Sequence, residues 1–289
     1  IQNNDGSLWI ATTQRGIMQI KNQKVVQHLT AKNKLTSNNC RRIEIDSEKF
    51  KADKDISKLI EIHEKPFESD INYIAGYSTL PLYRYFVIEN TIDTLILDAL
   101  KWKIKEADIV LSNGFRFCPP NSTPDKTGNI PITNGYIFDM LPVDSVVRTG
   151  SVTGKQIFDW LERELNNVFA KDASQRLGGW VIKFKGMKIS FMAYEENGRR
   201  VKEVVVNGKP LDMVKSYRIC ACEREGDPED MLCRMRGVLN PINTSFTLHS
   251  VLKEYLSVNS PVTPSPPMSA KVLDASQTLL TQVTGVDYQ

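Results

Sequence analysis

The spacing of apolar positions changes along the chain, and these changes predict four segments. In residues 1–46, short apolar stretches alternate with turn residues, which is typical of short strands joined by tight turns. Residues 47–69 are rich in charge and have apolar positions at helical spacing, so we interpret them as a connector. Residues 70–264 alternate between strand-like and helix-like patterns and predict a mixed α/β domain. We interpret residues 265–289 as an extended tail, because the sequence leading into it is rich in proline.

Local signals within residues 70–264 place the ends of several elements. Asn90 and Thr247 are each expected to cap the first turn of a helix, and Thr153 with Gln156 matches a capping box. An Asn-Gly pair after residue 206 predicts a hairpin turn. The expected strands are 73–77, 85–88, 109–111, 181–184, 188–192, 201–206 and 217–222, and the expected helices are 90–104, 133–141, 153–168 and 247–256.

Composition favours a soluble globular protein and excludes two classes. The 289 residues are 41% apolar and 25% charged, which is enough apolar material to bury a core. The net charge of +3, with no long run of Lys or Arg, argues against a nucleic-acid partner. No apolar run approaches the length that spans a membrane. The chain begins at Ile1 without an initiator Met or a signal peptide, so we interpret it as a fragment or mature product of open localisation.

The cysteine and histidine content predicts neither a metal site nor a catalytic residue. The five cysteines do not form two close pairs as in a zinc site, so free thiols are expected, while a pair between Cys222 and Cys233 stays open. The three histidines lie far apart in the sequence, and for His249 we expect a packing or surface role. A dinuclear metal hydrolase needs several His and Asp ligands, which this chain lacks, and we expect no cofactor in it.

Two polar stretches follow apolar runs and are the candidate binding residues. The first lies directly after the apolar run 109–111, and the second follows the apolar run 219–221. Charges at the carboxyl end of a strand are better site candidates than charges in the middle of a helix. For both stretches a solvated turn whose charges pair at the surface remains the alternative. The candidates are Asn113, Gly114, Phe115 and Arg116 in the first stretch, and Arg224 and Asp227 in the second.

Residues 70–264 resemble the C-terminal domain of the 5′-nucleotidase family. The resemblance rests on the order and spacing of matching stretches, which are Glu89–Thr91, Asp98–Leu100, Ala107–Gly114, Ile132-Thr133, Phe138–Pro142, Val152–Gln156 and Gly226-Asp227. It implies an α+β fold in which helices cover paired sheets. It also implies a domain that binds substrate and presents it to a separate N-terminal metallophosphatase domain, which holds the divalent metal pair and the catalytic groups. That domain is absent from this sequence. The family is periplasmic or extracellular.

The candidate residues depart from the nucleotidase pattern. The Asn-Gly-Phe-Arg turn at 113–116 is shorter than the family's Asn-Gly-Gly type turn. Val143 and Ala221 stand where nucleotidases carry the two aromatic rings that stack on the base. These departures are similar to the sulfur-oxidation, thiosulfohydrolase-like branch of the family. The resemblance therefore implies a small anionic substrate, held by Arg116 and oriented by Asn113, with Arg224 and Asp227 completing the pocket.

Residues 1–46 resemble a single repeat of the propellers carried by two-component sensor proteins. The strings Asp5–Thr12, Gly16-Ile17 and Leu35–Asn39 carry this similarity. One repeat needs neighbours to bury its faces. Two further interpretations follow. The chain is a non-catalytic ligand-binding module of a propeller-bearing sensor, or the sequence joins two unrelated pieces near residue 46.

Overall fold

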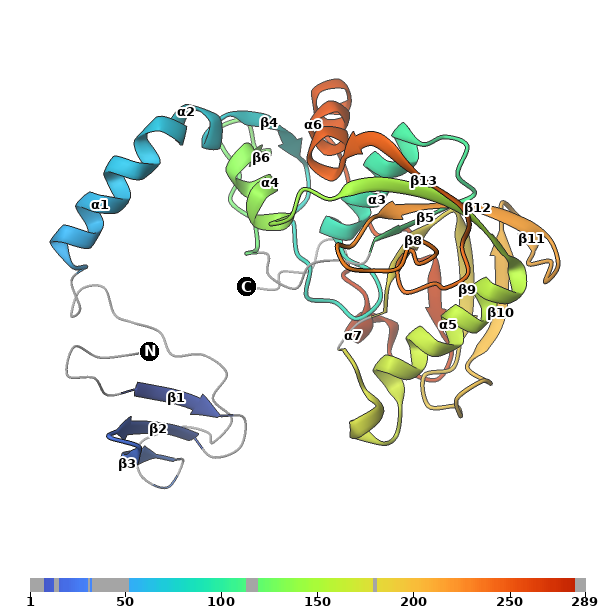
Figure 1. The fold of residues 1–289 in the computed structure, drawn as a ribbon, viewed down its shortest axis with the longest axis horizontal. Helices are drawn as coiled ribbons and strands as arrows, with labels where there is room; N and C mark the ends of the chain where they lie inside the picture. The colour runs from blue at the N-terminus through green and yellow to red at the C-terminus, as the bar shows by residue number, and fades with distance from the viewer. Residues whose placement is uncertain are drawn as a thin grey trace. The chain divides into compact units, whose positions relative to one another are not determined.

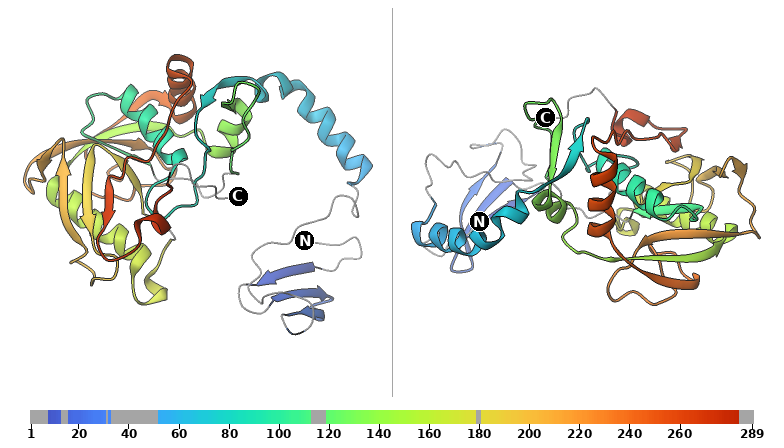
Figure 2. Two further views of the ribbon diagram at one scale, coloured as in Figure 1. Left: turned by 180° about the vertical axis from the view of Figure 1, so that it is seen from behind. Right: turned by 90° about the horizontal axis from the view of Figure 1, so that it is seen from above.

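The protein separates into two compact units, Ile1–Pro66 and Phe67–Gln289, in a computed structural model (Figures 1 and 2). Each unit is described by itself. The structure describes residues 8–12, 16–30, 32, 52–112, 119–178 and 181–283. Among these residues, no helix has the length and apolar character needed to cross a membrane.

The first unit contains a small antiparallel sheet and a helix. Strand β2 (Gly16–Lys21) pairs with β1 (Leu8–Thr12) on one side and with β3 (Lys24–Leu29) on the other. Helix α1 (Lys54–Glu64) lies in the segment interpreted as a connector, and the Asp53 side chain accepts hydrogen bonds from the first-turn amides. These elements agree with the strands and helix expected from the sequence. The propeller resemblance itself stays a prediction.

The second unit is built on a five-stranded sheet in the order β13-β7-β12-β5-β8, with a four-stranded sheet in the order β11-β10-β9-β14 and a β4-β6 pair. Its strands are β4 (Ile74–Ser78), β5 (Ile109–Ser112), β6 (Ile130–Thr133), β7 (Val146–Thr153), β8 (Lys183–Lys185), β9 (Met187–Phe191), β10 (Val201–Val206), β11 (Lys209–Pro210), β12 (Ser216–Cys222), β13 (Leu239–Thr247) and β14 (Ala270–Val272).

The helices of the second unit begin where the sequence places their caps. The Asn90 side chain caps α3, and Thr153 with Gln156 forms the expected capping box at α5. Thr247 caps α6. The helices are α2 (Glu68–Ile71), α3 (Thr91–Lys103), α4 (Asn134–Met140), α5 (Gly154–Phe169), α6 (Leu248–Asn259) and α7 (Gln277–Leu280), with short 3₁₀ turns at Lys65–Phe67 and Ala173–Gln175.

Both faces of the five-stranded sheet are covered, and every residue of β5 is buried. Successive side chains of β5 point to opposite faces: Ile109 and Leu111 join the core formed with α5 and the four-stranded sheet, and Val110 joins the core formed with α3, α4 and α6. Figure 1 shows α3 and α6 on one side of the sheet and α5 on the other. The result is an α+β fold with helices covering paired sheets, as the family resemblance implies.

Two expectations about the second unit differ from the structure, and one alternative left open by the sequence is decided. No strand forms over 85–88: the Phe86 carbonyl accepts from the Lys183 ammonium, and the Val87 carbonyl accepts both from that ammonium and from the Val181 amide. The segment interpreted as an extended tail contains β14, which adds a parallel strand to β9, and α7. Cys222 and Cys233 are free thiols, and burial raises the pKa of Cys222 to about 11, which makes it a poor nucleophile at neutral pH.

Candidate functional site

Three segments distant in sequence meet at one edge of the five-stranded sheet. Strands β5 and β12 run parallel with Cys220 opposite Val110, so both strands end at the same edge. Strand β7 is antiparallel to β12, and Cys222 faces Val147, so β7 begins at this edge. The amide of Glu223 donates to the carbonyl of Val146 at 2.7 Å and joins two of the segments directly. The sequence-based expectation that both polar stretches lie at strand ends therefore agrees with the topology.

Of the predicted site residues, the structure describes two. Asn113, Gly114, Phe115 and Arg116 lie outside the described residues, as does the neighbouring Cys118. Arg224 and Asp227 form a tight turn just after β12, in which the Asp227 amide donates to the Arg224 carbonyl at 3.1 Å. Gly226 has φ +84°, a left-handed conformation that glycine adopts without strain. Arg224 is exposed and Asp227 half-buried.

The segment after this turn is fastened to α5. The Trp160 indole donates to the Cys233 carbonyl at 2.9 Å, and the Gln156 amide donates to the Gly237 carbonyl at 2.8 Å. The Arg234 guanidinium pairs with the buried Glu164 carboxylate at 2.7 Å. In contrast, within the described part of the chain the side chains of Arg224 and Asp227 have no hydrogen bond or ion pair. A fixed frame therefore presents two free, oppositely charged side chains at the sheet edge.

The two positions at which the family resemblance implies base-stacking rings, Val143 and Ala221, carry no aromatic side chain. Val143 lies in the segment that leads into β7 and is 50% exposed. Ala221 is 0% exposed, on the face of β12 that packs in the core together with Leu232 and Met235. The segment that contains Leu232 and Met235 thus helps to bury this face of β12 at Ala221. A base could stack on neither residue here, and base–aromatic stacking is worth about 1–3 kcal/mol per base.

A buried polar cluster lies where β5 ends, at the last described residue before the segment 113–118. The Asp93 carboxylate accepts from the Ser112 hydroxyl at 2.8 Å, from Arg84 Nη2 at 3.1 Å and from the Asn90 amide at 2.7 Å. Burial acts to raise the pKa of Asp93, but the cations Arg84 and Lys183 and these hydrogen bonds outweigh it, and the pKa lies below its usual value. The cluster fixes the N-terminus of α3 to the end of β5.

Lys183 and Glu89 extend this cluster, and both are electrostatically perturbed. Lys183 lies opposite Ser112 in the β5–β8 ladder, and its ammonium donates to the Val181 carbonyl at 2.8 Å as well as to the two carbonyls named above. Burial lowers the pKa of Lys183 to about 7 and raises the pKa of Glu89 to about 7. The void between them measures about 10 Å³, which is room for one water at most. The cluster is thus a structural support and not a ligand pocket.

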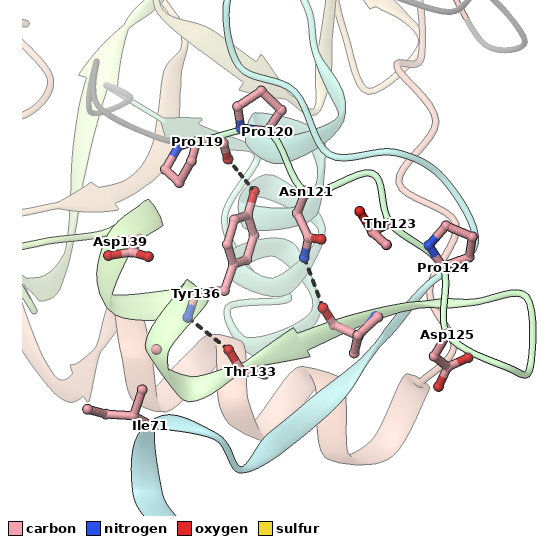
Figure 3. A pocket seen from close by; sticks show the side chains of 12 residues that line it. Ile71, Pro119, Pro120, Asn121, Thr123, Pro124, Asp125, Thr133, Tyr136 and Asp139 are labelled. Atoms are coloured by element: carbon pink, nitrogen blue, oxygen red, sulfur yellow. Dashed lines mark hydrogen bonds between the residues drawn. The ribbon is translucent and has the colours of Figure 1, made fainter. Parts of the chain in front are cut away.

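A larger cavity of about 530 Å³ opens between α2, β6, α4 and the loop that begins at Pro119 (Figure 3). The Tyr136 hydroxyl donates to the Pro119 carbonyl at 3.2 Å across it, and Asn121 donates to the Pro131 carbonyl at 2.9 Å. Its charged lining residues among those described are Asp125 and Asp139. Two carboxylates make this cavity unfavourable for an anion, so its size does not identify it as the site.

The structure shows a packing role for His249 and, among the described residues, no cluster of metal ligands. His249 is buried, its Nε2 lies 2.6 Å from the Leu141 carbonyl oxygen, and its ring packs edge-on against Phe138. Within the described ranges, no group of three or more His, Cys, Asp or Glu residues lies close enough to hold a metal ion, so no described residue is assigned to one. Sequence-based reasoning missed Arg84, Arg148 and Lys183 as buried cations. A charge inside an apolar run, as in Val181–Phe184, is the signal that marks such a residue.

The family described as "5′-nucleotidase, C-terminal domain" matches residues 70–223. Protein UshA of Salmonella pullorum is 25% identical over 131 residues, and the 5′-nucleotidase of Vibrio vulnificus is 27% identical over 131 residues. Each alignment covers 45% of this chain but only 22% of the relative. The chain therefore corresponds to a small part of these proteins.

Solved structures show the same fold. The sulfate thiohydrolase SoxB of Thermus thermophilus aligns with a TM-score of 0.58 and 21% identity, over 81% of this chain and 39% of the other. A 5′-nucleotidase precursor from Thermus thermophilus aligns with a TM-score of 0.60 and 18% identity, over 76% of this chain and 43% of the other. The two scores are nearly equal, so the fold does not distinguish a thiohydrolase-like from a nucleotidase-like substrate.

Proposed function

This chain belongs to the 5′-nucleotidase family through its C-terminal domain, and we propose that residues 70–264 bind the substrate of a metallophosphoesterase-type hydrolase. One of the curated relatives is a 5′-nucleotidase, and the matched region is a small fraction of each relative. In the proposal, a separate metallophosphatase domain holds the divalent metals and performs the hydrolysis, while this chain supplies only the substrate-binding half. The family membership also favours a periplasmic or extracellular location.

The proposed substrate is a small anion and not a nucleoside. One observation carries this choice: Ala221 is fully buried beneath the chain's own segment, and Val143 is aliphatic, so both stacking rings of a nucleotidase are replaced. The converging strand ends carry the polar residues Arg116, Arg224 and Asp227 but no base-stacking rings. A planar guanidinium can bind a sulfate- or phosphate-like group through two parallel hydrogen bonds.

The proposed roles follow from the two polar stretches. Arg116 binds the anionic group and Asn113 orients it, with Gly114 and Phe115 shaping the turn. Arg224 adds a second positive charge from the end of β12. Asp227 accepts a hydrogen bond from a protonated or hydroxyl-bearing part of the substrate. The free side chains of Arg224 and Asp227, on a turn whose frame is fixed at both ends, support these two assignments.

A thermal-shift comparison of four compounds tests the proposed substrate class. Because a ligand that binds only the folded state raises the melting temperature, thiosulfate and sulfate are expected to raise it, whereas adenosine is not. AMP is expected to act no more strongly than sulfate, since only its phosphate finds a partner. Sodium chloride at matched ionic strength is the control. An increase with adenosine that exceeds the increase with thiosulfate would contradict the absence of a base clamp.

A second candidate is a ligand-binding module of a propeller-bearing sensor. The β1-β2-β3 sheet favours it, because Leu8, Val25 and Val26 are exposed on strands that would be covered by neighbouring repeats. Sequence upstream of Ile1 separates the two candidates. Further blades there would favour the sensor, and a metallophosphatase domain would favour the hydrolase.

A further inference from the structure

We propose that Arg148 is the positioning residue of the Arg224–Asp227 turn, holding the two ends of the substrate loop 223–229 in place from the face of β7. This inference rests on the proposed function, because it concerns the same binding site. Arg148 contacts neither candidate side chain and therefore acts through the loop.

A closed network joins Arg148 to the start of the loop. Its Nη2 donates to Glu223 Oε1 at 2.7 Å and its Nε donates to Asn243 Oδ1 at 2.5 Å. Asn243 Nδ2 in turn donates to Glu223 Oε2 at 3.1 Å. Both oxygens of the Glu223 carboxylate thus have a partner, and the three side chains come from three adjacent strands or their ends, β7, β12 and β13. A carboxylate held on both oxygens cannot swing away as a singly bonded one can.

Arg148 also reaches the end of the loop. Its Nη1 donates to the Glu229 carbonyl at 3.3 Å. One guanidinium therefore bonds to residues on both sides of the Arg224–Asp227 turn. Beyond Glu229 the chain is fastened to α5, so the turn is the part of the segment whose side chains remain free. Arg148 therefore fixes the distance between the two ends of the turn, Glu223 and Glu229.

Arg148 is buried, and its contacts with the loop 223–229 satisfy its guanidinium inside the protein. Arg148 is 6% exposed, although arginine is rarely buried without partners. The rigid fork of its guanidinium matches several acceptors in fixed directions, which the single ammonium of a lysine does not do. Arg148 lies directly opposite Ala221 in the β7–β12 ladder, so it stands beside the position where nucleotidases carry a stacking ring. At this position the chain has an arginine that holds the loop 223–229, and no ring on which a base could stack. We call this arrangement the Arg148 clamp.

The test compares Arg148→Met with a matched control in the full chain. Arg163→Met makes the same change at an arginine of α5 that donates to the Arg234 carbonyl, farther along the same segment. Hydrogen exchange of amides 223–229 measures the clamp without any ligand, and calorimetric titration with thiosulfate measures binding. Arg148→Met is expected to raise exchange in 223–229 at least about tenfold and to weaken thiosulfate binding about tenfold, whereas Arg163→Met changes neither.

Two further variants keep the proposal testable if Arg148→Met does not fold. Glu223→Gln keeps the volume but removes the ion pair and one of the two hydrogen bonds, because its amide nitrogen cannot accept. It keeps the other hydrogen bond and is expected to raise exchange in 223–229 by a smaller factor. Arg148→Lys is expected to retain only part of the protection from hydrogen exchange that wild type shows in 223–229. Unchanged exchange in Glu223→Gln and Arg148→Lys would overturn the role of Arg148. A wild-type chain that does not bind thiosulfate but shows the exchange difference would overturn the proposed function and support the clamp.

Discussion

Replacing Asp93 by alanine is expected to lower the free energy of unfolding by about 3–5 kcal/mol, because it leaves a buried guanidinium without its ion-pair partner. The side chains of Arg84 and Asp93 are 5% and 4% exposed and lie 3.1 Å apart. Arg84 keeps only the Met140 carbonyl, and the Ser112 hydroxyl loses its acceptor. Loss of this support also releases the end of β5 from which the predicted substrate turn begins.

Urea unfolding followed by circular dichroism measures this effect, with Asp98→Ala as the matched control. Asp98 lies five residues further along α3 and pairs with Lys185, but both side chains are partly exposed, so the control is expected to cost at most about 1 kcal/mol. Asp93→Asn retains an acceptor for Ser112 and is expected to fall between the two. The interpretation of the cluster would be wrong if Asp93→Ala and Asp98→Ala destabilised the protein equally.

The stability of the protein is expected to depend on pH through Glu89 and Lys183, with opposite signs on either side of pH 7. Glu89 has an ordinary pKa of 4.5 and a folded pKa of about 7, so between these values the folded state binds more protons than the unfolded state. Stability from this group therefore falls as pH rises from 4.5 to 7. At about 1.4 kcal/mol per pKa unit, the change is on the order of 3 kcal/mol.

Lys183 acts in the opposite direction over a higher range. Its pKa falls from 10.5 to about 7 on folding, so between these values the unfolded state binds more protons. Stability from Lys183 therefore rises as pH increases from 7 to 10.5. The charges that face it are Asp93, Arg84 and Glu89. The two groups together predict a minimum in their combined contribution near pH 7.

Unfolding measured from pH 4.5 to 10.5 in single variants isolates each contribution. Glu89→Gln keeps an acceptor for the Ser269 amide and is expected to gain stability relative to wild type as pH rises from 4.5 to 7. Lys183→Met loses the three hydrogen bonds that the ammonium donates, and its stability relative to wild type is expected to fall further between pH 7 and 10.5, where the folded wild type carries a neutral amine. Differences that stay constant across these ranges would contradict the perturbed pKa values.

The sequence predicts the central strands, because both faces of their sheet are covered. Ile109 and Ile219 belong to apolar runs that are buried on two sides, and such runs show in composition alone. Helix starts at Asn90, Thr153 and Thr247 are also predictable, since caps act within three residues. Signals of this kind need no knowledge of distant contacts.

Features that depend on distant contacts are not predictable in this way. Strand β13 contains Asn240 at φ +50° followed by Pro241, and it exists because β7 offers it an edge. The expected strand at 85–88 has a suitable composition but meets the Lys183 ammonium, which belongs to a residue almost 100 positions away. For the site, the sequence places polar residues at strand ends, yet the role of Arg148 follows only from its position across the sheet from Glu223.

The central claim is that the converging strand ends bind a small anion, to which Arg224 adds a second positive charge in addition to that of Arg116. Calorimetric titration of the full chain with thiosulfate tests it most directly, in wild type, Arg224→Met and Arg236→Met. Arg236 is an exposed arginine of the same segment and controls for a general loss of positive charge. We predict that Arg224→Met weakens thiosulfate binding about tenfold or more, equivalent to about 1.4 kcal/mol, and that Arg236→Met leaves it unchanged. Equal affinity of Arg224→Met and wild type would contradict the account.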